Sequence, residues 1–163
     1  MRSNIKTKLS EHRFFQGFPD SVLNEIAGCG SIKKIKGDTM LAHEGDPADE
    51  FYAILEGRIA VETSLPGNPP RVLQTLHAGE IIGWSWIFPP YEWTFDAHVV
   101  KDATLMAFDA RCLRGRVEND HELGYLLMKR FAQIITQRLK SSRLQLLNLY
   151  GSEDQPTNTA PGT

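Results

Sequence analysis

Residues 50–62 read Glu-Phe-Tyr-Ala-Ile-Leu-Glu-Gly-Arg-Ile-Ala-Val-Glu. Two short apolar runs flank Glu56-Gly57, and glycine enters tight turns without the steric penalty of a side chain. The stretch therefore predicts two strands, Glu50–Leu55 and Arg58–Glu62, joined by a turn.

The same pattern continues on both sides of this stretch, where glycine and proline separate further short apolar runs. Because no crossover helix lies between the runs, a parallel α/β fold is excluded. The sequence predicts instead a mainly β fold, an antiparallel barrel or two-sheet roll over about residues 31–110. The remaining predicted strands are Ser31–Ile35, Thr39–His43, Val72–Leu76, Ala97–Val100 and Ala103–Phe108.

A helical segment is predicted before the β region. Within residues 10–29, Asp20 is suited to cap a helix over Ser21–Cys29, because its side chain can accept a free backbone N–H. Gly28 and Gly30 mark the end of that helix.

A second helical pattern follows the β region. Residues 117–150 predict one long helix with room for a single break, and Asn119 and Asp120 are suited to cap it. Residues 1–9 are predicted to be an N-terminal extension. Residues 151–163 contain no large apolar side chain and predict a disordered tail.

The composition excludes two broad classes. The chain has 163 residues, of which 41% are hydrophobic and 23% charged, so it can build a packed core and is not disordered throughout. The net charge of −2 argues against a dedicated nucleic-acid binder, which would be strongly basic.

Cysteine usage and hydropathy bear on the compartment. Cys29 and Cys112 are too few and too far apart in sequence for a disulfide framework, so we expect reduced thiols in a cytoplasmic protein. The polar N-terminus argues against a secretory signal. The longest strongly apolar stretch, Ile81–Tyr91, is interrupted by two prolines and is too short to span a membrane.

Three further motifs occur in a fixed order: Lys36-Gly37-Asp38 with Gly45-Asp46, then Phe51-Tyr52-Ala53-Ile54-Leu55-Glu56-Gly57, then Gly79-Glu80-Ile81-Ile82-Gly83. Together they resemble the cyclic nucleotide-binding domain of the catabolite-activator type, over about residues 10–150. The resemblance implies an antiparallel β-roll of the double-stranded β-helix or jelly-roll type, with an N-terminal helix and a long C-terminal helix. It also implies a non-enzymatic regulatory domain that senses a small-molecule effector.

The segment after Gly83 departs from that family where a nucleotide is held. Family members carry a Glu after this glycine for the ribose hydroxyl, and later an Arg for the phosphate; the corresponding residues here are Trp84 and Phe95. No Lys or Arg lies between Val72 and Val100. A phosphate entering a partly dry pocket needs a cation or several donors. We therefore expect weak or absent binding of ordinary cyclic nucleotides and a non-standard effector, such as another planar ligand. The alternatives are a ligand-free protein–protein interaction module and a true regulatory protein that binds the cyclic nucleotide cAMP or cGMP.

Residues 84–95 hold six of the fifteen aromatic residues and all three tryptophans. Two interpretations remain open: an aromatic box for a planar ligand, or a pocket collapsed around its own side chains. The alternation of the aromatics favours a hairpin around Pro89-Pro90, whereas the resemblance favours a one-turn helix near Ser85–Phe88.

The resemblance and the aromatic pattern together define the candidate ligand-binding residues. Ser85 and Asp96 are suited either to orient a ligand or to make local hydrogen bonds. Ser142 corresponds to the hydroxyl residue that family members extend to the base. Gly37, Gly45, Gly57 and Gly79 are interpreted as turn residues only. The full candidate set is Gly83, Trp84, Ser85, Trp86, Trp93, Phe95, Asp96, Ala97 and Ser142.

The C-terminal helix predicts a homodimer. Four apolar residues and Ser142 follow a short 4-3-4-3 heptad spacing on it, and the resemblance implies dimerisation, because family members dimerise through this helix. The alternative is that the stripe packs on the chain's own roll. The helix is also basic, which indicates either a solvated face or an acidic partner protein. The predicted interface residues are Ile135, Leu139, Ser142, Leu146 and Leu149.

Other functions have less support. Only 13 polar residues follow Tyr150, too few for the helix-turn-helix domain that follows in related transcription factors, so we expect no direct DNA binding. The lack of a long apolar stretch predicts no membrane association. The five histidines are scattered, which argues against a cupin-type metal site. No G-x-S-x-G motif is present for nucleophilic catalysis. Haem binding through His77 or His98 stays open.

Overall fold

The computed structural model describes residues 2–153 and divides the chain into two compact units, Met1–Leu126 and Leu127–Thr163. The helices are α1 (Arg2–Glu11), the 3₁₀ helix η1 (Arg13–Phe15), α2 (Asp20–Ala27), α3 (Ala110–Asn119) and α4 (His121–Glu153). The strands are β1 (Gly30–Ile35), β2 (Thr39–Ala42), β3 (Glu50–Thr63), β4 (Arg71–His77), β5 (Ile81–Ile82) and β6 (Asp96–Asp109).

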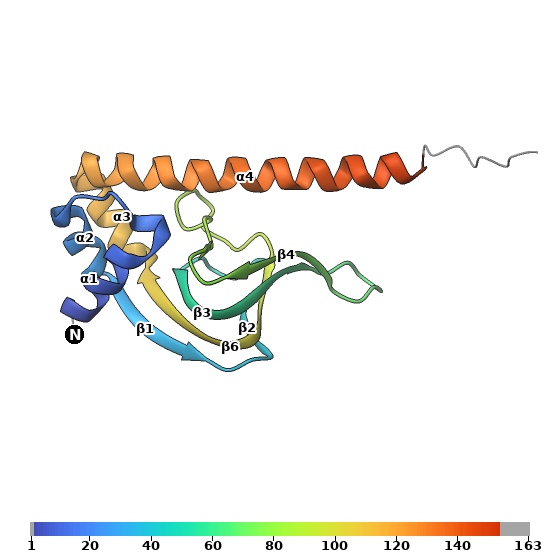
Figure 1. Cartoon of the computed structure of the whole chain (residues 1–163), viewed down its shortest axis with the longest axis horizontal. Helices are drawn as coiled ribbons and strands as arrows, with labels where there is room; N and C mark the ends of the chain where they lie inside the picture. The colour runs from blue at the N-terminus through green and yellow to red at the C-terminus, as the bar shows by residue number, and fades with distance from the viewer. Residues whose placement is uncertain (1, 154–163) are drawn as a thin grey trace, which may run out of the picture. The chain divides into compact units, whose positions relative to one another are not determined.

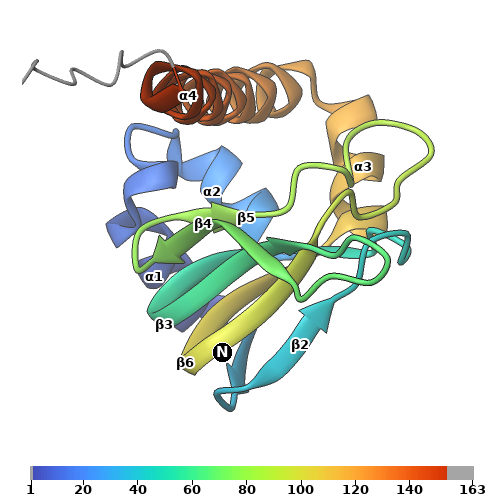
Figure 2. The same cartoon turned by 90° about the vertical axis from the view of Figure 1, so that its right-hand side faces the viewer.

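The two longest strands, β3 and β6, pair with each other and form the spine of a six-stranded sheet. On β6, β1 pairs along the second half and β2 along the first; on β3, β4 and β5 pair at separate positions. Every pairing is antiparallel, and the strands curl into an open roll (Figure 2). The predicted mainly β roll with flanking helices is confirmed.

The structure corrects the predicted turn at Gly57, because β3 runs unbroken through it. Gly57 has a φ of +100°, and the β3–β6 register shifts on both sides of it. A Cβ on Gly57 would lie 2.6 Å from Cα of Ala103 and from the carbonyl oxygen of Asp102. The glycine therefore forms a bulge where two long strands approach closely, a position that no other residue could take without strain. The two predicted runs of β6 are likewise one strand.

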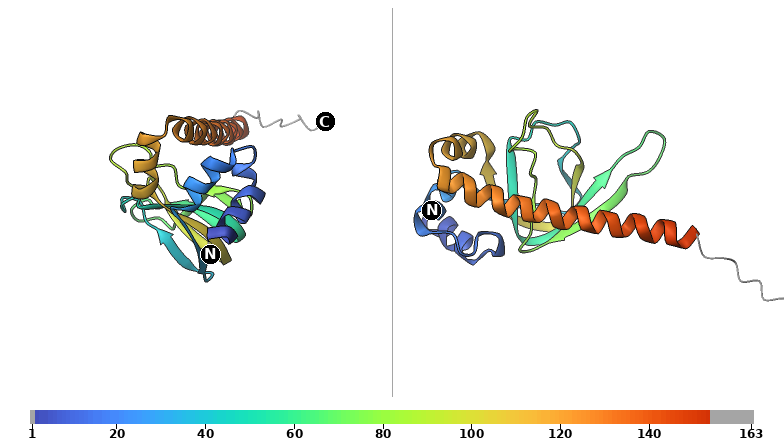
Figure 3. Two further views of the ribbon diagram at one scale, coloured as in Figure 1. Left: turned by 90° about the vertical axis from the view of Figure 1, so that its left-hand side faces the viewer. Right: turned by 90° about the horizontal axis from the view of Figure 1, so that it is seen from above.

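The helices α1, α2 and α3 gather at one end of the roll, and the turn between β3 and β4 projects from the other end (Figures 1 and 3). Phe15 is fully buried among the rings of Phe14, Phe18 and Phe108. The predicted N-terminal extension is instead most of α1, whose Leu9 is fully buried.

Two helix boundaries before the roll differ from those predicted. The predicted helical stretch over residues 10–29 is divided among the end of α1, η1 and α2. Asp20 lies in the first turn of α2 rather than at its cap, which is Pro19. A carboxylate in a first turn still interacts favourably with the helix dipole.

The predicted long helix is broken at Asp120, whose Oδ1 accepts the N–H groups of Glu122 and Leu123 and so caps α4. The helix before the break, α3, begins earlier than predicted, because Asp109 caps it by accepting the N–H of Cys112 at 2.8 Å. α4 continues to Glu153, so residues 151–153 are helical and not part of a tail. Residues 154–163 of the predicted tail lie outside the described residues.

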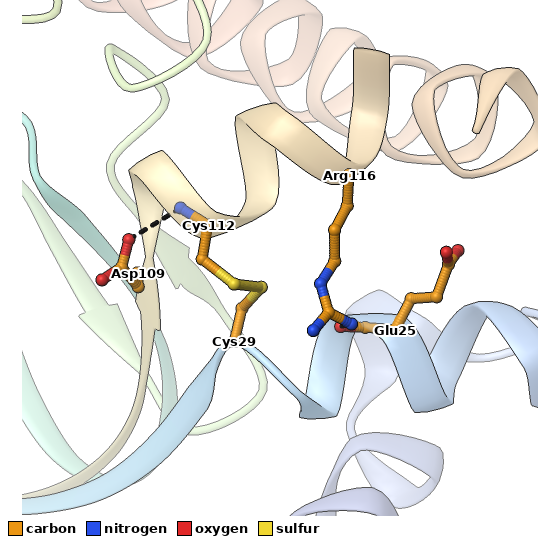
Figure 4. The surroundings of a disulfide bond; sticks show 5 residues. All are labelled: Glu25, Cys29, Asp109, Cys112 and Arg116. Atoms are coloured by element: carbon orange, nitrogen blue, oxygen red, sulfur yellow. Dashed lines mark hydrogen bonds between the residues drawn. A yellow bond between two sulfur atoms is a disulfide. The ribbon is translucent and has the colours of Figure 1, made fainter. Parts of the chain in front are cut away.

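The expectation of reduced thiols is wrong, because Cys29 and Cys112 form a disulfide with a Cα–Cα distance of 5.8 Å (Figure 4). The two cysteines are 83 residues apart in sequence, but β1 pairs with β6 from Gly30 opposite Phe108 onward. That pairing brings the end of α2 beside the start of α3. Within residues 2–153, no helix combines the length and the apolar character that crossing a bilayer requires.

Candidate ligand-binding cassette

Residues 83–96, which we call the cassette, connect β5 to β6. The loop after β2 holds the second half of the cassette through backbone hydrogen bonds. The N–H of Ala48 donates to the carbonyl of Tyr91 at 2.7 Å, and the N–H of Trp93 donates to the carbonyl of Asp46 at 2.9 Å. The N–H of Gly45 donates a hydrogen bond to the carbonyl of Trp93 at 2.8 Å. The Gly45-Asp46 motif therefore positions the cassette.

The cassette is neither the predicted hairpin nor the predicted one-turn helix. It consists of consecutive turns, in which Ile87 N–H donates to the carbonyl of Trp84 and Tyr91 N–H to that of Phe88. The two prolines at 89 and 90 lie inside the second turn. Proline lacks an N–H and disfavours a helical residue before it, which prevents either regular element from forming.

Gly83 begins the cassette with a φ of +97° and is buried. A Cβ at this position would lie 2.9 Å from Cη2 of Trp93 and 3.3 Å from Cβ of Phe51. Glycine is therefore required both by the backbone conformation and by the indole ring that packs against it. Trp93 therefore packs directly against Gly83, the glycine at which the resemblance places a ligand phosphate.

Four of the six cassette aromatics divide into two groups and do not form one face. Trp86 is 2% exposed and stacks on Phe51, with ring centroids 4.7 Å apart; Phe51 in turn stacks on Phe108. Trp93 and Phe95 form the second group with Tyr52 and Trp84. Alternation alone could not separate the groups, because the turns rotate successive side chains to different sides.

The second group includes Phe95, which the resemblance aligns with the family's phosphate-binding Arg. Phe95 is 6% exposed, and its ring centroid lies 5.3 Å from that of half-buried Trp84 and 5.6 Å from that of Trp93. The aromatic rings are therefore packed against one another.

Of the two polar candidates in the cassette, Asp96 makes local hydrogen bonds. Asp96 Oδ1 accepts the N–H of Glu44 at 2.8 Å, and its Oδ2 accepts the hydroxyl of Ser64 at 3.0 Å, so the carboxylate fixes the β2 and β3 ends. Ser85 is half-buried. Ala97 is fully buried within the sheet, paired with Val61 on β3.

Ser142 and the predicted interface residues belong to the second unit and lie on α4. Ile135 is half-buried and Ser142 is exposed. Leu139, Leu146 and Leu149 are 51%, 53% and 65% exposed.

Arg114 on α3 is a cassette contact that the sequence reasoning missed. Its Nη1 donates to the carbonyl of Trp86 at 2.7 Å, and its guanidinium carbon lies 4.2 Å from the ring centroid of Tyr91. A hydrogen bond and a cation–π contact thus hold both halves of the cassette from outside. The only sequence signal was a cluster of arginines before α4, which resembles a solvated helix face.

A polar cluster lies beside the second aromatic group. Both carboxylate oxygens of Glu50 lie 2.9 Å from Nζ of Lys33, and Glu50 Oε2 also accepts the hydroxyl of Tyr52 at 2.8 Å. Burial is the larger cause and this hydrogen bond the smaller cause of a Tyr52 pKa that lies far above its usual range. Lys33 is therefore a cation already paired with a carboxylate.

His98 is not a free ligand for haem iron. Its Nδ1 lies 3.0 Å from Oε1 of Glu62 and its Nε2 lies 2.9 Å from Oδ1 of Asp38, so both ring nitrogens are bonded. These two hydrogen bonds, that to Glu62 first, raise the pKa of His98. Across residues 2–153, no group of three or more His, Cys, Asp or Glu side chains is arranged to hold a metal ion.

A cleft of about 430 Å³ lies away from the cassette, between the α1–η1 region and β3. Charges of both signs line it, Lys8 and Arg13 against Glu11 and Glu56. His12, also in its lining, is 4% exposed; its Nδ1 accepts the N–H of Phe14, and burial lowers its pKa. His12 thus stabilises the turn into η1, and the mixed charges favour no ligand class.

Known proteins match this chain in sequence as well as in fold. The family model described as "Cyclic nucleotide-binding domain" matches residues 32–120. The CRP-like cAMP-activated global transcriptional regulator of Mycobacterium tuberculosis is 24% identical over 114 residues, covering 70% of this chain and 49% of that protein. The chain thus spans about half the length of the curated relatives it matches.

Two solved structures share the fold. A cyclic nucleotide-binding protein from Geobacter metallireducens has a TM-score of 0.75 and 27% identity, and the match covers 82% of this chain and 97% of that one. A cyclic nucleotide-binding domain from Methylobacillus flagellatus has a TM-score of 0.74 and 20% identity, covering 90% of this chain and 83% of that one.

Proposed function

This chain belongs to the cyclic nucleotide-binding domain family, and from that membership we propose that it is a non-enzymatic regulatory domain whose cassette is closed by its own aromatic side chains. In this proposal an ordinary cyclic nucleotide is not the effector. A ligand that enters is planar and weakly charged, because it must replace or stack on Trp93 and Phe95. The proposal places the domain in the cytoplasm and assigns it no catalytic step.

One observation carries the proposal: Phe95, which the resemblance aligns with the phosphate-binding Arg, is buried against Trp84 and Trp93. A cyclic phosphate carries a negative charge, and desolvating it without a cation or donors is costly. Arg114 approaches the cassette but is engaged with the Trp86 carbonyl and the Tyr91 ring. Lys33 is engaged with Glu50.

The test is calorimetric titration of cyclic AMP and cyclic GMP. We expect no binding by the wild type at millimolar nucleotide. The double variant Trp84→Glu with Phe95→Arg restores the ribose acceptor and the phosphate cation, and we expect it to bind. Phe88→Arg is the matched control, since Phe88 is 50% exposed in the same loop and the added cation would stay in solvent.

Two results would count against the proposal. Low-micromolar affinity of the wild type for either nucleotide would show that the closed cassette opens readily. The second result would come from a thermal-shift screen of planar apolar compounds and cyclic nucleotides. A ligand of the native state must raise the melting temperature, so the screen shows which class of compound binds. A melting temperature that rises only with nucleotides would overturn the proposed ligand chemistry.

A second candidate function is a protein-interaction module that needs no ligand. The exposed leucines at 139, 146 and 149 favour it, because they follow heptad spacing on one helix. The partner we propose is a second copy of the chain, and an acidic partner protein is the alternative that the basic residues of α4 suggest.

A further inference from the structure

The helix α3 is attached on two sides. On one side, Cys112 forms the disulfide to Cys29, and Nη1 of Arg116 donates to the carbonyl of Glu25 at 2.7 Å (Figure 4). On the other side, Arg114 binds the cassette. Residues two apart in an α-helix lie about 200° apart around its axis, so Cys112 and Arg114 point in nearly opposite directions. The helix therefore lies between the disulfide and the cassette.

We propose that the Cys29–Cys112 disulfide is a redox-responsive bond, and that its reduction loosens α3 and weakens the hold of Arg114 on the cassette. The proposal concerns the mobility of residues 84–95 and involves no nucleotide. This inference rests on the proposed function in one respect, namely that the domain lies in the cytoplasm. Disulfides are rare in that compartment, and those found there are usually transient, catalytic or redox-sensing.

The order of the reduction steps depends on which of the two cysteines a thiol reductant attacks first. Cys29 is 7% exposed, whereas Cys112 is half-buried and so the more exposed residue of the pair, and we expect a thiolate to attack Sγ of Cys112. A cellular dithiol reductant attacks this sulfur and forms a mixed disulfide, while Cys29 leaves as a thiolate and is protonated by water. The second thiol of the reductant then displaces Cys112. Two electrons and two protons pass to the cysteine pair, and the reductant becomes a disulfide.

The roll does not depend on the disulfide alone. The N–H of Asp109 donates to the carbonyl of Cys29 at 2.9 Å, and the N–H of Ala110 donates to that of Asp49 at 2.8 Å. These bonds hold the start of α3 in the reduced chain. The rest of α3, which carries Arg114 and Arg116, loses its disulfide bond to Cys29. Reduction is therefore expected to increase local opening and leave the sheet intact.

The test uses the three tryptophans, all of which lie in the cassette. Iodide quenching of their fluorescence and amide hydrogen exchange of residues 84–95 are measured with and without dithiothreitol. In the wild type we expect reduction to raise the quenching constant by about twofold through local opening. Circular dichroism should show an unchanged β signal.

Three variants define the route. In Cys29→Ala with Cys112→Ala, quenching should be raised and unaffected by the reductant. In Arg114→Ala, it should be raised with the disulfide intact. Arg111→Ala is the matched control: Arg111 is an exposed arginine on the same helix, and its removal should leave quenching low when oxidised and responsive to reduction. If the cysteine variant does not fold, the wild-type comparison alone carries the test.

Two results would overturn the proposal. Thiols that stay blocked in native protein under dithiothreitol would identify a permanent structural disulfide. Two free thiols with unchanged quenching and exchange at residues 84–95 would show that the bond and the cassette are uncoupled. Neither result bears on nucleotide binding, which calorimetry measures separately.

Discussion

Trp93 contributes both to the stability of the roll and to the closure of the cassette. Its ring packs against Gly83 and Phe95, and it is 5% exposed. We expect Trp93→Ala to lower the free energy of unfolding by about 3–5 kcal/mol, the usual cost of truncating a large buried aromatic residue. Urea denaturation followed by circular dichroism measures this loss.

Phe88→Ala is the control for this prediction. Phe88 lies in the same loop but is 50% exposed, so its truncation should change the free energy of unfolding by no more than about 0.5 kcal/mol. Equal losses in the two variants would mean that the rings around Trp93 do not form a packed core.

His98 makes stability depend on pH. Its hydrogen bonds to Glu62 and Asp38 raise its pKa, so protonated His98 stabilises the folded chain. That contribution is complete below the ordinary histidine pKa of about 6.5 and is lost as pH rises through the raised folded value. His98→Gln cannot be protonated.

The measurement is the difference in unfolding free energy between wild type and His98→Gln across the neutral range. We expect the wild type's advantage to be largest at acidic pH and to shrink as pH rises. His12, whose pKa is lowered, has the opposite pH dependence but is common to both proteins and cancels in the difference. An advantage that grows with pH would contradict the assigned role of Glu62 and Asp38.

At the scale of an element, β3 depends on Gly57. An alanine there would adopt a φ of +100° and place its Cβ 2.6 Å from Cα of Ala103. Left-handed strain costs about 1–2 kcal/mol and overpacking a further 1–3 kcal/mol, so we expect Gly57→Ala to destabilise the chain by roughly 2–5 kcal/mol. Thermal unfolding measures the loss.

Gly67→Ala is the matched substitution. Gly67 has a φ of +79°, but a Cβ added there would meet nothing within 4 Å, so only the strain of about 1–2 kcal/mol remains. A loss at Gly57 no larger than that at Gly67 would mean that β3 and β6 separate easily at the bulge.

Strands and helix caps could be predicted because their signals are local. The apolar runs located β1, β2 and β4, and Asp120 located the start of α4. Gly57 misled because a glycine in a strand bulge and a glycine in a turn give the same local pattern. The difference lies in Ala103, which is distant in sequence. The disulfide was missed for the same reason, since the β1–β6 register decides it.

The aromatic segment could be located in the sequence, but its backbone conformation could not. Trp84 and Phe95 were identified from the family pattern and do lie together. The separation of Trp86 from Trp93 depends on Phe51 and Tyr52, adjacent β3 residues that point to opposite faces. No pattern within residues 84–95 contains that information.

For the whole molecule we expect a homodimer through α4. Leu139→Glu with Leu146→Glu places like charges in the proposed seam, where desolvating unpaired charge is costly. The variant should be monomeric by sizing with light scattering and keep its β signal. Leu144→Glu with Leu147→Glu is the control, because these leucines are also exposed, at 61% and 64%, but lie off the seam, and it should stay dimeric.

A wild type that is monomeric at high micromolar concentration would contradict the seam. Dissociation of both double variants would contradict the heptad assignment, since the off-seam leucines would then also lie in the interface.

The β3–β6 pairing also bears on how quickly the roll assembles. Glu50 pairs with Asp109 and Glu62 with Asp96, so the spine joins residues that are 59 (109 − 50) and 34 (96 − 62) positions apart in sequence. Such non-local pairing is slow, because closing a long loop costs entropy before any contact forms. The β3–β4 hairpin can form early. The cassette leads into β6 and can close only after that strand has docked. Substitutions in the cassette should therefore change the unfolding rate more than the folding rate.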